Sequence, residues 1–149
     1  MLTFDKNERI NVEEFSREDE QMFLLFCMGI VKYNLNQIPK GHKYYNQFDV
    51  RYYDGGLGGD GVEIFPKIYP DSCFIWGLCE GDLAGTSYFG DGVTGTVCIR
   101  MKTTVFTIGE LNTYIIDTLK QLLFDDKIGE ILDEETRKKE FAKYGIDKK

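Results

Sequence analysis

Five runs rich in β-branched and aromatic residues fill the middle of the chain, with Gly, Asp and Pro residues between them. In the first run, FDVRYY, the apolar residues Phe48, Val50 and Tyr52 take alternate positions. The other runs are VEIFPKIY (62–69), CFIWGLC (73–79), LAGTSYF (83–89) and VTGTVCIRMKTTVF (93–106). A period of two and short connections are typical of antiparallel strands. The sequence therefore predicts an antiparallel meander of about five strands.

Helical patterns lie on both sides of this region. Two capping boxes, Asn11 with Glu14 and Ser16 with Asp19, precede apolar residues at three- and four-residue spacing. The resulting N-terminal helix is expected to end near Asn36.

Two helices are expected after the strands. Thr107 with Glu110 forms a capping box before an apolar stripe that reaches about Phe124, and a further helix is expected between about Asp133 and Gly145. One N-terminal helix, a mainly antiparallel sheet and two C-terminal helices make an α+β fold.

Two features bear on the sheet edges. Pro66 has no N–H to donate to a ladder, so its strand is expected to be an edge strand or to be bulged. The long run from Thr94 to Phe106 is a candidate for pairing with a second copy. Monomer and homodimer both stay open.

The chain of 149 residues is expected to form a single domain, 1–149. Its longest apolar run, Met22 to Val31, is about half as long as a membrane span, and its N-terminus lacks the pattern of a secretory signal. We expect a cytoplasmic protein without membrane association.

The net charge of −7 is concentrated in the middle of the chain, where residues 54–93 hold seven acidic side chains and one basic one. Nucleic-acid binders need positive charge on their contact surface because phosphate neutralisation supplies most of their affinity. We therefore expect no direct nucleic-acid binding.

The glycine-rich loop Asp54–Gly61 allows three interpretations. The overlapping segment Gly55–Glu63 matches one nine-residue copy of a calcium-binding β-roll repeat, but that architecture shares each calcium ion between successive repeats. A phosphate cradle would need a following helix, whereas a strand is predicted here. The third interpretation is a hairpin connection in which glycine supplies unusual backbone angles.

Few residues suggest catalysis. His42 lies in a lysine-flanked loop, and Cys27, Cys73, Cys79 and Cys98 lie in apolar segments without zinc-ligand spacing. We expect buried thiols, no metal, no cofactor and no catalytic residue.

Tyrosine and glycine are concentrated in the same region as the negative charge: six of nine tyrosines and eleven of sixteen glycines lie between residues 44 and 95. Such mixtures are typical of recognition surfaces. The predicted partner-binding residues are Tyr52, Tyr53, Asp54, Asp60, Asp82, Tyr88 and Asp91.

These features predict a non-enzymatic, acidic binding protein that inhibits a basic, nucleic-acid-handling partner, as immunity proteins, antitoxins and phage-borne inhibitors do. Two alternatives are a small-ligand or metal-binding domain that uses loop 54–61, and a small enzyme with carboxylate catalysis.

Overall fold

The structure is a computed structural model that describes residues 5, 7–55, 59–67, 73–79, 82–89, 93–101 and 103–123. In parts of β4, β5 and β6 the description covers the backbone alone. The elements are β1 (Arg9–Asn11), the 3₁₀ helix η1 (Val12–Glu14), α1 (Arg17–Leu35), β2 (Phe48–Tyr53), β3 (Gly61–Pro66), β4 (Cys73–Cys79), β5 (Asp82–Phe89), β6 (Val93–Arg100), β7 (Val105–Thr107) and α2 (Ile108–Leu123).

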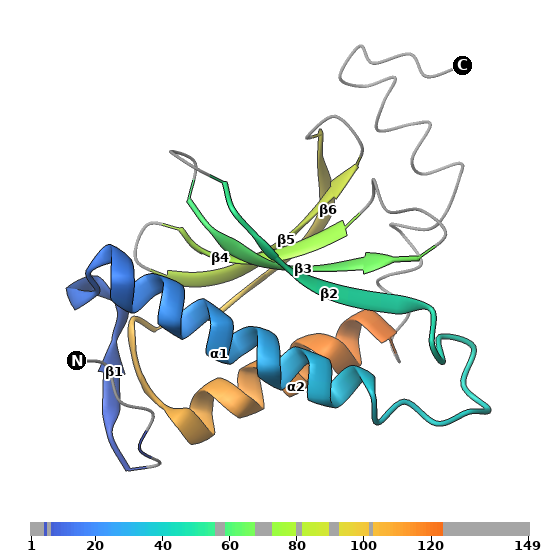
Figure 1. The fold of residues 1–149 in the computed structure, drawn as a ribbon, viewed down its shortest axis with the longest axis horizontal. Coiled ribbons are helices and arrows are strands. Elements are labelled where there is room, and N and C mark those ends of the chain that lie inside the picture. The colour runs from blue at the N-terminus through green and yellow to red at the C-terminus, as the bar shows by residue number, and fades with distance from the viewer. Residues whose placement is uncertain are drawn as a thin grey trace.

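A five-stranded antiparallel sheet in the order β2-β3-β4-β5-β6 forms one layer of the fold. The helices α1 and α2 form the second layer and cover one face of the sheet (Figure 1). The predicted α+β class, the five-stranded sheet and the N-terminal helix are confirmed. Of the two C-terminal helices, the first is α2, and the second lies outside the described residues.

Both capping signals at the N-terminus operate, each on a different helix. The Ser16 hydroxyl accepts a hydrogen bond from the Asp19 amide, and the Asp19 carboxylate accepts one from the Ser16 amide. This capping box begins α1. The Asn11 side chain instead accepts a hydrogen bond from the Glu13 amide and caps η1.

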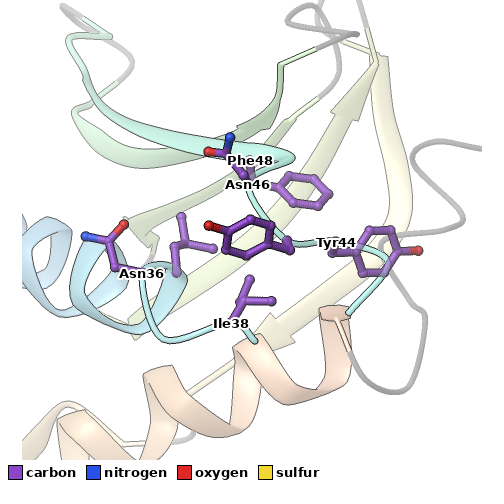
Figure 2. A pocket seen from close by; sticks show the side chains of 7 residues that line it. Asn36, Ile38, Tyr44, Asn46 and Phe48 are labelled. Atoms are coloured by element: carbon purple, nitrogen blue, oxygen red, sulfur yellow. The ribbon is translucent and has the colours of Figure 1, made fainter. Parts of the chain in front are cut away.

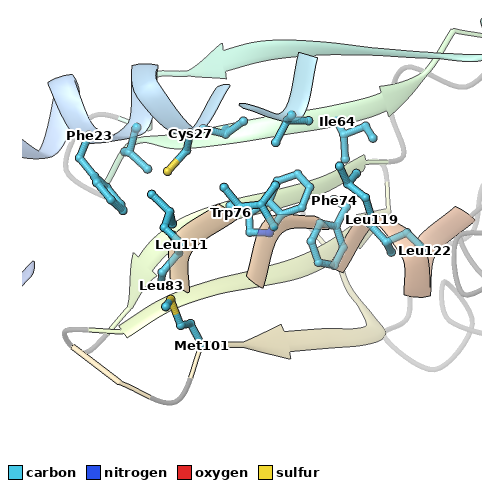
Figure 3. Packing of buried hydrophobic residues seen from close by; sticks show 14 of the residues in the cluster. Phe23, Cys27, Ile64, Phe74, Trp76, Leu83, Met101, Leu111, Leu119 and Leu122 are labelled. Carbon is cyan, nitrogen blue, oxygen red and sulfur yellow. The ribbon is translucent and has the colours of Figure 1, made fainter. Parts of the chain in front are cut away.

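The core lies between the sheet and the two helices (Figure 3). The sheet contributes Val62, Ile64, Phe74, Trp76 and Leu83, and the helices contribute Phe23, Leu24, Cys27, Leu111, Ile115, Leu119 and Leu122. Trp76 is 1% exposed and meets the Phe74 ring edge to face at a centroid distance of 4.9 Å, so it anchors the core. Neither helix in the described residues is long and apolar enough to span a membrane.

The expectation for Pro66 was wrong. Strand β3 lies between β2 and β4, and its register with β2 is regular up to the Phe48–Pro66 pair. The β3–β4 ladder already ends at Ile64 and Phe74, so the proline stands beyond it and interrupts no hydrogen bond to β4.

The expectation of one long strand from Thr94 to Phe106 was also wrong. Strand β6 ends at Arg100, and the Thr103 hydroxyl then accepts a hydrogen bond from the Val105 amide. Such local side-chain bonds compete with a ladder. The chain re-enters as β7, which pairs with β1 in a separate two-stranded sheet that the sequence did not predict.

We predict opposite effects for alanine at two glycines. A Cβ atom at Gly85 would lie 2.2 Å from Phe74 Cε1, so Gly85→Ala should destabilise the fold by about 2 kcal/mol through overpacking. At Gly109, in α2, the nearest atom lies at 3.7 Å, so Gly109→Ala should stabilise it by about 0.5 kcal/mol. Urea unfolding measures both, and equal effects would contradict the packing at Gly85.

Candidate functional site

Asp60 connects the sheet to the start of α1. Its side chain accepts hydrogen bonds from the Tyr52 hydroxyl at 2.5 Å, from Arg17 Nη2 at 3.4 Å and from Gln21 Nε2 at 3.5 Å. The Asp60 side chain is 1% exposed, whereas that of Arg17 is 57% exposed. The end of the β2–β3 hairpin is thereby held against the first turns of α1.

The negative charge of Asp60 is stabilised by hydrogen bonds inside the protein. The hydrogen bond from Tyr52 lowers the pKa of the Asp60 carboxyl group below its usual value, and this outweighs burial, which acts in the opposite direction. Burial and the same hydrogen bond raise the pKa of the Tyr52 hydroxyl. At neutral pH the pair therefore consists of a carboxylate and a neutral phenol.

The structure of the described part of the glycine-rich loop supports the hairpin interpretation. A Cβ atom at Gly55 would lie 1.9 Å from the Gly59 carbonyl oxygen, and Gly59 has a φ of +91°. Both positions therefore require glycine. The Gly55 amide also hydrogen-bonds to Asp60, so the loop holds the carboxylate in place. Residues 56–58 lie outside the described residues.

Five of the seven predicted partner-binding residues are at the end of the sheet where α1 begins (Figure 1). Tyr53 is 43% exposed, and Asp54 is also exposed. Tyr52 packs against the core and Asp60 is buried, so neither offers a partner the surface that the sequence suggested. Asp82 begins β5 at this end, and the description of it is limited to the backbone.

The two remaining predicted residues do not join this group. Tyr88 pairs with Cys73 and Thr94 at the opposite end of the sheet, and its side chain is not described. Asp91 lies outside the described residues.

Exposed acidic residues gather instead where α1 begins, a feature that sequence reasoning missed. Glu13, Glu14 and Glu18 are exposed, and Asp19 and Glu20 are partly exposed. We call these five residues together with Asp54 the acidic end. The signal was present in the sequence, but Glu14 and Asp19 were interpreted only as capping-box residues.

The second buried carboxylate, Glu63, lies on the other face of the sheet. Val62 and Ile64 face the helices, so Glu63 between them points away from the helices. Its carboxylate is paired with the guanidinium group of Arg51, the residue opposite it on β2. The pKa of the Cys73 thiol is raised to about 12, mainly by burial and in addition by the negative charge of Glu63. Asp60 and Glu63 thus do not converge as a catalytic pair.

His42 lies at the far end of α1 from Asp60. Its Nδ1 atom accepts a hydrogen bond from the Tyr44 amide at 3.1 Å, and the two rings are 5.7 Å apart. The described part of the chain thus does not bring His42 together with either buried carboxylate.

A pocket of about 140 Å³ opens beside this loop (Figure 2). It is lined by Leu35, Asn36, Ile38, Tyr44, Tyr45, Asn46 and Phe48. Asn46 has a φ of +57°, and its side-chain oxygen accepts a hydrogen bond from Lys67 Nζ at 2.7 Å. A cavity on the order of 150 Å³ holds one benzene ring. The pocket thus has room for a single small ring, at the opposite end of α1 from loop 54–61.

Within the described ranges, no three potential metal-ligating side chains are grouped together. Comparisons with protein-family models, with curated proteins and with solved structures found no match for this chain.

We predict that Tyr52→Phe destabilises the protein by about 2 kcal/mol at neutral pH, because it leaves the buried Asp60 carboxylate short of a donor. A lowered folded-state pKa gives stability that is present above the unfolded value, about 4, and is lost as the pH falls further. The difference from wild type should therefore be full at pH 7 and smaller at pH 3, with the loss setting in below about pH 5.

Urea unfolding at a series of pH values measures this difference. Asp117→Asn, at an exposed acid on α2, is the matched control and should leave the free energy of unfolding nearly unchanged. A Tyr52→Phe penalty that is constant with pH would contradict the role given to the Asp60 charge.

Proposed function

We propose that this protein is a non-enzymatic, cytoplasmic binding module whose acidic end recognises a basic surface on another protein. The observation that carries the proposal is the set of exposed carboxylates at the start of α1 beside Tyr53 and Asp54. The proposal keeps the binding role expected from the sequence. It moves the main contact from the strands to the α1 start.

The charge balance at this end supports the proposal. The segment 9–21 holds two basic residues, Arg9 and Arg17, and Arg17 is engaged by the buried Asp60. Because Asp60 occupies that guanidinium group, Arg17 does little to cancel the charge of Glu13 and Glu14. An excess of carboxylates on one end of a molecule gives a directional field that accelerates association with a basic partner.

The arrangement also supports a class of partner. Proteins that handle nucleic acids have basic surfaces spaced to bind phosphates. Carboxylates on a helix start can occupy the positions of phosphates, and an exposed tyrosine such as Tyr53 adds contact area at low entropic cost. The proposed activity is inhibition, by occupation of the partner's nucleic-acid surface.

We predict that Glu13→Lys combined with Glu14→Lys abolishes partner capture. Both side chains are exposed, so the reversal should change the field and leave the fold intact. Wild type, the double variant and Asp117→Lys are used side by side to capture proteins from the native cell. A basic protein should be retained by wild type and by Asp117→Lys, and lost with the double variant.

The salt dependence of association is the second readout. With the captured protein, the association rate should fall steeply as salt rises, because screening shortens the range of the field. A captured protein that binds all three forms equally, or whose association rate does not respond to salt, would overturn the proposal.

The pocket beside Tyr44 favours a second candidate function, the binding of a small one-ring ligand. Its apolar wall of Ile38 and Phe48 lies next to the amide groups of Asn36 and Asn46, a combination typical of ligand sites. Single-ring fragments such as benzamide should shift the backbone amide NMR signals of Tyr45 and Asn46. The filling variant Ile38→Trp should abolish the shifts, and fragments without any effect would exclude this candidate.

A further inference from the structure

The solvent face of α1 carries a regular row of residues. Glu18, Met22, Leu25, Gly29 and Lys32 follow one another at alternating four- and three-residue spacing, the spacing of a helix-packing seam. The buried residues of α1, Phe23, Leu24, Cys27 and Val31, lie on the opposite side. Leu25 is 50% exposed, which makes it one of the most exposed large apolar side chains described.

Gly29 makes a notch in this row. Among the described residues, a Cβ atom there would meet nothing within 4 Å, so packing against them does not require glycine at this position. Its φ is not positive, so the helical backbone does not require it either. Glycine in a helix interior is destabilising relative to alanine. Close approach of another molecule is a physical reason to place glycine between two exposed side chains.

We propose that the occupant of this face is a second copy of the chain, with the two α1 helices packed antiparallel about a two-fold axis between Leu25 and Gly29. In this register each Leu25 side chain enters the notch at the partner's Gly29, so both copies use the same patch. Because of the two-fold axis, the contact between a large residue and a small one forms twice, once on each side of the axis.

The charges along α1 favour the antiparallel orientation. The first turn of the helix contains Glu18, and the last turn contains Lys32. In the register set by Leu25 and Gly29, Lys32 lies across from the partner's Met22, one turn from the partner's Glu18. The lysine stem can cover the methionine while its ammonium group meets the carboxylate. A parallel arrangement would instead place Glu18 against Glu18.

The size of this surface limits the expected affinity of the dimer. One helix against one helix buries less than the roughly 1,600 Å² of a standard interface. The dimer is therefore expected to be weak, concentration-dependent and sensitive to salt. Glu13 and Glu14 lie outside the row, whereas Glu18 belongs both to the row and to the acidic end.

The test is the molar mass in solution, measured by sedimentation equilibrium from low micromolar to millimolar protein. Wild type should pass from monomer to dimer. Leu25→Glu should stay monomeric because it brings like charges together at the axis. Gly29→Leu should raise the melting temperature of the monomer, since leucine favours helix, and yet weaken the dimer at least about tenfold by filling the notch.

A charge exchange tests the register. Glu18→Lys and Lys32→Glu should each weaken dimerisation, and the double variant should restore it. Lys40→Glu, at an exposed lysine outside the row, is the matched control and should leave dimerisation unchanged. A wild type that stays monomeric at millimolar concentration, or a Leu25→Glu variant that still dimerises, would overturn the proposal. The double variant failing to recover would overturn the antiparallel register.

Discussion

The apolar face of the five-stranded sheet has to be removed from water, and α1 and α2 do this together. Trp76 and Phe74 project from β4 into the space that Phe23, Leu111 and Leu122 fill from the helices (Figure 3). The Phe74 ring can pack in this space because Gly85 on β5 has no side chain to collide with it. Burial of this face supplies the main driving force and sets where every other element lies.

The position of α1 on the sheet then determines which acidic side chains are buried and which are exposed. Because the start of α1 passes beside the β2–β3 connection, Arg17 and Gln21 reach Asp60, and Tyr52 completes its hydrogen bonds. Of the three acids between residues 54 and 93 whose side chains are described, Asp60 and Glu63 are buried and Asp54 is exposed. Most of the outward negative charge described at this end is therefore carried by η1 and α1.

Much of the fold could be predicted from local patterns because those patterns act over a few residues. The runs FDVRYY and CFIWGLC match the bounds of β2 and β4, since period-two alternation and turn residues both limit them. Ser16 and Asp19 likewise mark the start of α1. In contrast, Arg17 and Gln21, the partners of Asp60 on α1, lie 43 and 39 residues away in the sequence, and no local pattern predicts them. Strands of three residues, such as β1 and β7, are too short to show a period.

The candidate surface was only partly predictable for a related reason. Tyr53 and Asp54 were identified correctly as exposed, but exposure at Tyr52 and Asp60 depended on which side of the hairpin α1 would cover. The same uncertainty hid the row on α1, because Leu25 and Cys27 are both apolar in the sequence. Only the packing of the helix shows that Leu25 faces solvent while Cys27 is 1% exposed.

The connectivity of the sheet has a consequence for the order in which the chain folds. Each strand from β2 to β6 pairs with its neighbour in the sequence, so every hairpin closes a short loop and can form early. The pairing of Arg9 with Thr107 closes a loop of nearly the whole described chain, which carries a larger entropic cost. The β1–β7 ribbon should therefore join the structure after the hairpins, and it should be among the first parts to detach when the protein opens.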